Sequence, residues 1–118
     1  MMRWLAVLLL SALPVMAQQE VSSAGSATVR VLDKISGVTD DIEIGRSERK
    51  TYGRLSIVLG DCRYPTNNPH SDAFGWLEIR DEAMAEPAFS GWMVASSPAL
   101  NAMDNPRYDV WLLRCNNT

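Results

Sequence analysis

Three groups of side chains in this sequence could do chemistry, and the first is the acidic group formed by Asp40, Asp41 and Glu43. Carboxylate oxygens are the ligands that calcium prefers. These residues lie on a stretch that alternates like a β-strand, where successive side chains point to opposite faces, so the three cannot all face one ion. We therefore interpret them as a solvated strand face and predict neither a metal site nor a bound cofactor.

The second group is the run from His70 to Asp72, together with the serines Ser96 and Ser97. A nucleophile, its base and the group that orients the base converge from separate parts of a fold, which argues against neighbours in sequence. The Gly-x-Ser-x-Gly pattern of a nucleophile elbow is absent. Ser97 precedes Pro98 and is better explained as a helix cap. We predict no catalytic residue, and a hydrolase that uses Ser96 or Ser97 ranks third among the functions considered.

The third group consists of the two cysteines, Cys62 and Cys115. In an exported chain, two cysteines are most simply read as one disulfide. A redox-active pair or a pair of metal thiolates are the alternatives, but the sequence has no Cys-x-x-Cys and no second ligand cluster. Closing the loop between them is expected to stabilise the fold by roughly 4 kcal/mol on the chain-entropy model.

Export itself is predicted from the start of the sequence, MMRWLAVLLLSALPVMAQQE. Arg3 precedes an apolar run from Trp4 to Leu13, and small residues follow up to Ala17, which is typical of a secretory signal peptide over residues 1–17. An uncleaved signal anchor is the alternative, although a membrane-spanning helix needs about 20 apolar residues. No cysteine follows the run where a lipoprotein would need one. We expect the mature protein to be free in solution on the far side of a membrane, without stable membrane insertion after cleavage.

The length and charge of the chain limit the number of domains and the kinds of partner. Removing residues 1–17 from the 118-residue chain leaves enough for one small domain and no second one. The chain has 11 Lys and Arg against 14 Asp and Glu, a net charge of −3, and it shows no clustered basic stripe. A nucleic-acid-binding protein is expected to carry such a stripe, so we predict no nucleic-acid partner.

The elements that must position these side chains are mostly strands. We expect residues 18–27 to be a disordered lead-in and residues 28–118 to form a single all-β domain, an antiparallel β-sandwich or open barrel. About six strands are predicted from period-two alternation, with one short helix over residues 96–103 and a helical turn over 81–87. The expected strands are 28–35, 38–44, 54–62, 73–80, 89–95 and 107–115.

Two of these predictions concern how the strands are arranged. The last strand, residues 107–115, is apolar on both faces, so we expect it to be central and to neighbour residues 89–93. The pattern of residues 73–80 leaves open which face is buried. Phe74 or Trp76 could then lie on a second, partly exposed apolar surface.

The motifs FSGWM at residues 89–93, ASSPALN at 95–101 and YDVWLL at 108–113 resemble an exported bacterial family, domain of unknown function 2155. The resemblance covers residues 29–115 and includes Cys62, the proline-containing loop that follows it, and Cys115. It implies no activity and no catalytic residue. It does imply a Gram-negative, alphaproteobacterial periplasmic setting.

The chain is rich in large aromatic residues for its size, and exposed tryptophan and tyrosine are favoured at interfaces. We expect a noncatalytic periplasmic module that binds another cell-envelope protein or assists its assembly. A module that stacks a cell-wall glycan on Trp76 or Tyr64 is the alternative, while Trp92 and Trp111 are expected in the core. The candidate binding residues are Ser96, Ser97, Pro98, Asn101, Tyr64, His70 and Trp76.

Overall fold

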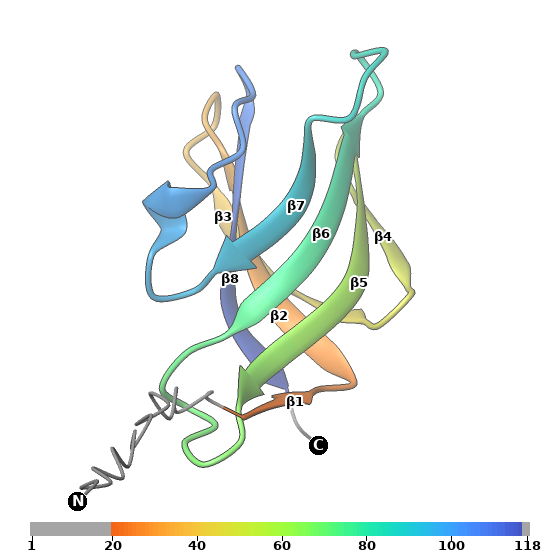
Figure 1. Ribbon diagram of the computed structural model, residues 1–118. Coiled ribbons are helices and arrows are strands. Elements are labelled where there is room, and N and C mark those ends of the chain that lie inside the picture. The colour runs from red at the N-terminus through yellow and green to blue at the C-terminus, as the bar shows by residue number, and fades with distance from the viewer. Residues whose placement is uncertain (1–19, 117–118) are drawn as a thin grey trace, which may run out of the picture.

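The protein consists almost entirely of β-strands arranged in two antiparallel sheets, which confirms the predicted all-β class (Figure 1). The structure is a computed structural model that describes residues 20–116. The two sheets face one another and do not close into a barrel. The strands are β1 Val21–Ser23, β2 Ser26–Asp33, β3 Thr39–Gly45, β4 Arg49–Tyr52, β5 Leu55–Pro65, β6 Phe74–Asp81, β7 Phe89–Val94 and β8 Tyr108–Asn116.

The larger sheet has five strands in the order β1-β5-β6-β7, with β4 also paired to β5. The smaller sheet has three strands in the order β3-β2-β8. The predicted hairpin around Ser36-Gly37 is confirmed, since β2 and β3 pair antiparallel from Ser26 opposite Gly45 to Leu32 opposite Thr39. Neighbouring strands in sequence therefore build most of the larger sheet, while β8 returns from the end of the chain to β2.

The core lies between the sheets and follows the alternation of apolar residues. Leu55, Ile57 and Leu59 of β5 are fully buried, as their period of two predicts. The open question about β6 is settled, because Leu77 and Ile79 point inward and are buried. The alternate residues of β6, including its aromatic ones, therefore lie on the outer face of the larger sheet.

The prediction that the last strand is central is wrong, and residues 89–93, expected to be its neighbour, lie in the other sheet. Within residues 20–116, β8 pairs only with β2 and is an edge strand, and β7 belongs to the other sheet. The apolar outward positions have another cause. Trp111 is half-buried on the outer side, and Leu113 falls at a β-bulge where the register with β2 shifts between Thr28 and Val29. A bulge adds a residue that has no direct partner.

The expected disordered lead-in is also wrong for the part that the structure describes. Val21–Ser23 forms β1, which pairs with the end of β5, and the Ala24 amide donates to the Cys62 carbonyl at 2.7 Å. Ala24 is buried, and β2 begins at Ser26. A short edge strand needs backbone partners rather than an apolar pattern, so the polar sequence hid it. The predicted signal peptide, residues 1–17, lies outside the described residues.

The predicted short helix is reduced to a 3-10 turn at Pro98–Leu100, labelled η1. Ser97 stands at its N-terminal boundary but makes no side-chain hydrogen bond to it, so the predicted cap is wrong. None of the three η1 residues is buried, which leaves nothing to stabilise a longer helix. Residues 82–88 form turns and no helix. Between residues 20 and 116 there is no helix long and apolar enough to cross a membrane.

Candidate functional site

The outer face of the five-stranded sheet carries a group of aromatic side chains near the end of β5. Pairing sets Phe74 opposite Arg63, and Trp76 opposite Trp92 on the other side. Directly opposed residues of antiparallel strands share a face, so these side chains come together there. We call Val21, Arg63, Phe74, Trp76 and Trp92 the outer aromatic surface.

Trp76 is the most exposed ring of this surface, with 38% of its area accessible. It meets Trp92 edge to face, with ring centroids 5.7 Å apart. It also lies against the backbone at Gly60, where a Cβ atom, if one were present, would sit 2.5 Å from Trp76 Cδ1. A shift in the β5–β6 register between Leu59 and Asp61 places Gly60 there. Glycine is therefore required for the ring to rest on the strand.

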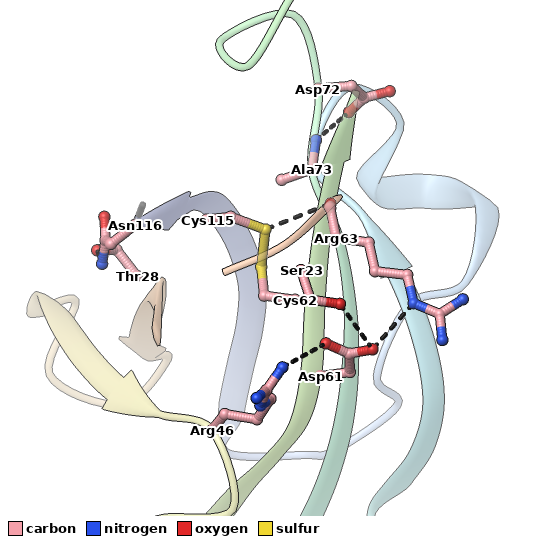
Figure 2. The surroundings of a disulfide bond; sticks show 10 residues. All are labelled: Ser23, Thr28, Arg46, Asp61, Cys62, Arg63, Asp72, Ala73, Cys115 and Asn116. Atoms are coloured by element: carbon pink, nitrogen blue, oxygen red, sulfur yellow. Dashed lines mark hydrogen bonds and ion pairs between the residues drawn. A yellow bond between two sulfur atoms is a disulfide. The ribbon is translucent and has the colours of Figure 1, made fainter. Parts of the chain in front are cut away.

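Arg63 supplies the charge at this surface. Its guanidinium carbon lies 5.1 Å from the centroid of Trp92, within range of a cation–π contact. Its Nε donates to Asp61 Oδ2 at 2.9 Å (Figure 2). Partial burial would raise the pKa of Asp61, but hydrogen bonds from Arg63 and Ser23 outweigh it and hold that pKa below its usual value. Asp61 thus stays ionised and keeps the Arg63 side chain in place.

The second oxygen of Asp61 is less well satisfied. Asp61 Oδ1 is buried and accepts no hydrogen bond from any residue between 20 and 116. Arg46 Nη1 lies 3.9 Å from it, which makes an ion pair (Figure 2). Because this oxygen is buried, it contributes to the support of the strand end and is not exposed to a bound molecule.

The outer aromatic surface is shallowly hollowed rather than deep. Val21, Arg63, Phe74 and Trp92 line a hollow of about 320 Å³. Val21 itself is 46% exposed. Apolar area and a guanidinium in one place can bind a partner by burial and polar contacts, but they include no nucleophile with a base beside it.

The predicted disulfide between Cys62 and Cys115 is confirmed, with Cα atoms 5.7 Å apart. Cys62 is fully buried and points inward between Asp61 and Arg63, which point outward. The bond therefore ties β5 of the larger sheet to β8 of the smaller one, next to Asp61 and Arg63 (Figure 2).

The structure brings two of the predicted surfaces together at a different place. Ser96 Oγ donates to Asp72 Oδ2 at 2.7 Å, and the Ser96 amide donates to Asp72 Oδ1 at 3.0 Å. His70 lines the same hollow, of about 370 Å³. In residues 20–116 no hydrogen bond joins His70 to Ser96 or to Asp72. Ser96 thus fastens one loop to another, and no catalytic triad is assembled among these groups.

The remaining predicted residues lie at several places. Asn101 Nδ2 donates to the Trp92 carbonyl at 2.8 Å and holds its segment against β7. Pro98 lies in η1 and is exposed, next to Ser97. Tyr64 is half-buried, packs against the core and lines a hollow of about 400 Å³ together with His70. Of the predicted binding residues, only Trp76 belongs to the outer aromatic surface.

Sequence reasoning missed Val21, Arg63 and the neighbouring Asp61. A usable signal was present for Arg63, because a cysteine bonded across the core must point inward and its neighbour must then point outward. Val21 could not be found in this way, since its strand was not predicted. Trp92 was expected in the core but is half-buried on the outer face.

The acidic group on β3 is engaged with neighbouring side chains. Arg30 forms a bidentate pair with Asp41, with Nε–Oδ1 at 2.7 Å and Nη2–Oδ2 at 3.1 Å. The Tyr52 hydroxyl donates to Asp40. Within the described range there is no group of three or more His, Cys, Asp or Glu placed to hold a metal ion.

Comparison with known proteins places these features in a family. A family model described as an uncharacterized protein conserved in bacteria, DUF2155, matches residues 27–115. An uncharacterized protein of Rickettsia prowazekii (strain Madrid E) is 25% identical over 99 residues, which are 81% of this chain and 64% of that protein. The chain thus spans less than two thirds of that relative's length. No solved structure matches the chain. The match over most of the domain confirms the resemblance seen in its motifs, and the chain belongs to the DUF2155 family of bacterial proteins.

Proposed function

We propose that this chain is an exported, periplasmic module that binds another cell-envelope protein through its outer aromatic surface and has no catalytic activity. The exposed cluster of Trp76, Trp92, Phe74 and Arg63 is the observation that carries the proposal. Tryptophan and arginine are the side chains most enriched among residues that dominate binding energy in protein interfaces. The disulfide is compatible with an exported protein, because such bonds persist in oxidising compartments.

The chemistry of the surface sets the kind of partner. Trp76 and Val21 offer apolar area that a partner would remove from water. Arg63 stays charged and exposed, although its Nε is held by Asp61. A matching partner therefore presents an apolar patch with an acidic side chain at its rim.

The test is crosslinking in the periplasm, followed by recovery of the adduct and identification by mass spectrometry. The surface variant combines Trp76→Ser with Arg63→Glu. The matched control is Ile35→Ser, which removes a side chain that is 77% exposed in the β2–β3 turn, outside the surface. We expect the same envelope protein with the wild type and the control, and a loss of about tenfold or more with the surface variant. Equal recovery from all three chains would refute the proposal.

A glycan ligand is the second candidate, favoured by the ring of Trp76, which is 38% exposed. A sugar ring could stack on the indole, and the exposed guanidinium of Arg63 could donate to a sugar hydroxyl. Tryptophan fluorescence titrated with soluble cell-wall fragments distinguishes the two candidates. A saturable change that is lost in Trp76→Ser and kept in Ile35→Ser would favour the glycan, whereas a flat titration would exclude it.

A further inference from the structure

A different part of the molecule, the free edge of β8, also has the properties of a binding site. Among residues 20–116, β8 pairs with β2 along one edge and with no strand along the other. An unpaired edge presents a row of backbone N–H and C=O groups, which are a template for another strand. The smaller sheet has three strands, so a fourth could be added there.

The place where that strand would lie is filled only by an irregular segment. Gly91 is buried on the inward side of β7, and a Cβ atom at this position would lie 3.1 Å from Asn101 Nδ2. Met103 is buried, while Leu100 is 75% exposed. The segment from Ser96 to Met103 therefore covers the inner side of β7 beside β8 without pairing to β8 as a strand.

Two hollows follow the free edge of β8. Asp109, Val110 and Trp111 line one of about 320 Å³, together with residues 98–103. Residues 113–115 line the other, of about 370 Å³, together with His70. Successive side chains of a strand point to opposite faces, so a hollow that touches three successive residues runs along the strand's edge. The edge is thus open at both ends of β8.

Charge distinguishes these two ends. Asp109 is paired with Lys34, whose Nζ lies 3.5 Å from Asp109 Oδ1. Arg114 is exposed and forms no ion pair with any residue between 20 and 116. The first hollow is mainly apolar, lined by Val110 and Met103. An occupant is therefore expected to be apolar at one end and acidic at the other.

We propose that β8 accepts an extended segment of a partner polypeptide as the fourth strand of the smaller sheet, in the place that residues 96–103 leave when they move away from β8. An apolar side chain of that segment enters the hollow beside Val110, and an acidic side chain lies against Arg114. Because of the bulge at Leu113, the two positions face opposite sides of the sheet and lie opposite residues three apart on β2, about 10 Å in an extended strand. Backbone hydrogen bonds supply affinity in this mode of recognition, and the alternate side chains supply specificity. The site is separate from the outer aromatic surface, so either can fail without the other.

The test joins a probe strand to the C-terminus of the full oxidised chain through a short glycine-serine linker. The probe has about eight residues, alternating threonine and valine, with one glutamate placed to pass Arg114. Tethering gives it an effective concentration in roughly the millimolar range. The control probe has proline at alternate positions, which removes the amides that a strand needs. Amide hydrogen exchange of residues 109–115 is the measurement.

We expect exchange across residues 109–115 to be slowed by about tenfold or more relative to the proline control. Replacing the glutamate of the probe by lysine should weaken this protection about threefold or more, and Arg114→Glu should reverse the preference. Arg114 is exposed, so the variant is expected to fold, and urea unfolding checks this. Equal exchange with the alternating and the proline probes would overturn the proposal. Equal protection by the glutamate and lysine probes would overturn its acidic specificity.

Discussion

The two ends of β5 and β6 each stack arginine on an aromatic ring, yet the two clusters differ in burial. At one end Arg63 lies 5.1 Å from the ring of Trp92 on the outer face. At the other end Arg54 and Arg107 lie 5.9 and 5.1 Å from the ring of Tyr108, which is 1% exposed. Both clusters contain an arginine over an aromatic ring. They differ in how firmly the neighbouring side chains hold that ring in place.

The Tyr108 end is built around a buried carboxylate. Asp81 is 2% exposed and accepts from the Ala83 amide at 2.9 Å, from Asn105 Nδ2 at 3.1 Å and from Arg54 Nη2 at 3.4 Å. Asn105 is itself buried, and its Oδ1 accepts from the Tyr108 amide at 2.9 Å. The oxygens of Asp81 and Asn105 are thus paired within the cluster, although Nε of Arg54 and of Arg107 is buried without a partner among residues 20–116. Buried hydrogen bonds of this kind favour one arrangement of the strands. This end is therefore structural.

The Trp92 end is fastened by the disulfide instead of by its side-chain cluster. Arg63 is exposed and pairs with Asp61, and exposed ion pairs contribute roughly 0–1 kcal/mol. Cys62, one residue away, carries the covalent link to β8. Because the bond holds the strands, the aromatic side chains on the outside are free to serve binding. The residues around Tyr108 thus stabilise the fold, and those around Trp92 are available to bind a partner.

Removing the disulfide should have the largest effect. We expect the double substitution Cys62→Ser and Cys115→Ser to lower the free energy of unfolding by about 4 kcal/mol, because the unfolded chain loses a long-range constraint. Urea unfolding of the oxidised wild type and the variant measures the difference. Adding a reductant to the variant should change nothing further. A loss below about 1 kcal/mol would mean that side-chain contacts, and not the bond, hold this end.

Asp81→Ala should have the next largest effect, about 3 kcal/mol, because it leaves Asn105 and the Ala83 amide with a lost partner in a buried place. The matched control is Asp41→Ala, which breaks an exposed pair with Arg30 and should cost about 1 kcal/mol or less. Urea unfolding measures both. Equal losses in the two variants would contradict the distinction drawn between buried and exposed carboxylates.

Acid should weaken the same end. The Ala83 amide and Asn105 hold the pKa of Asp81 below its ordinary value. A carboxylate whose pKa is lower in the folded state contributes stability that is complete above its unfolded pKa, about 4, and is lost as the pH falls through the folded value. The free energy of unfolding should therefore fall more steeply below about pH 4 in the wild type than in Asp81→Asn. Parallel curves would show that Asp81 does not supply this dependence.

Sequence reasoning succeeded where a local pattern or a residue type determines a structural feature directly. Alternation placed Leu55, Ile57 and Leu59 in the core, and the two cysteines gave the disulfide. It failed where position depends on partners distant in the sequence. The edge position of β8 follows from which strands pair, and the apolar outward residues of that strand suggested the opposite.

The candidate site shows the same division. Trp76 was predicted as a binding residue because the chain has more large aromatic side chains than so small a core can easily bury. Its platform, Gly60, depends on the shift in the β5–β6 register, and its neighbour Val21 on a strand whose sequence is polar. Neither signal can be read from periodicity alone.

The smallest effect on stability should come from Trp76→Ser, and it sharpens the comparison most. The ring is 38% exposed and rests on the outside of β5, so its loss should cost about 1 kcal/mol or less. Gly60→Ala is a second way to disturb this surface, because its Cβ atom would lie 2.5 Å from Trp76 Cδ1, too close for the ring to stay in place. Both variants should keep the urea midpoint close to that of the wild type while reducing recovery of the crosslinked partner. If either variant unfolded as readily as Asp81→Ala, the rings on the outer face would also stabilise the fold. The two clusters would then differ in burial but not in role.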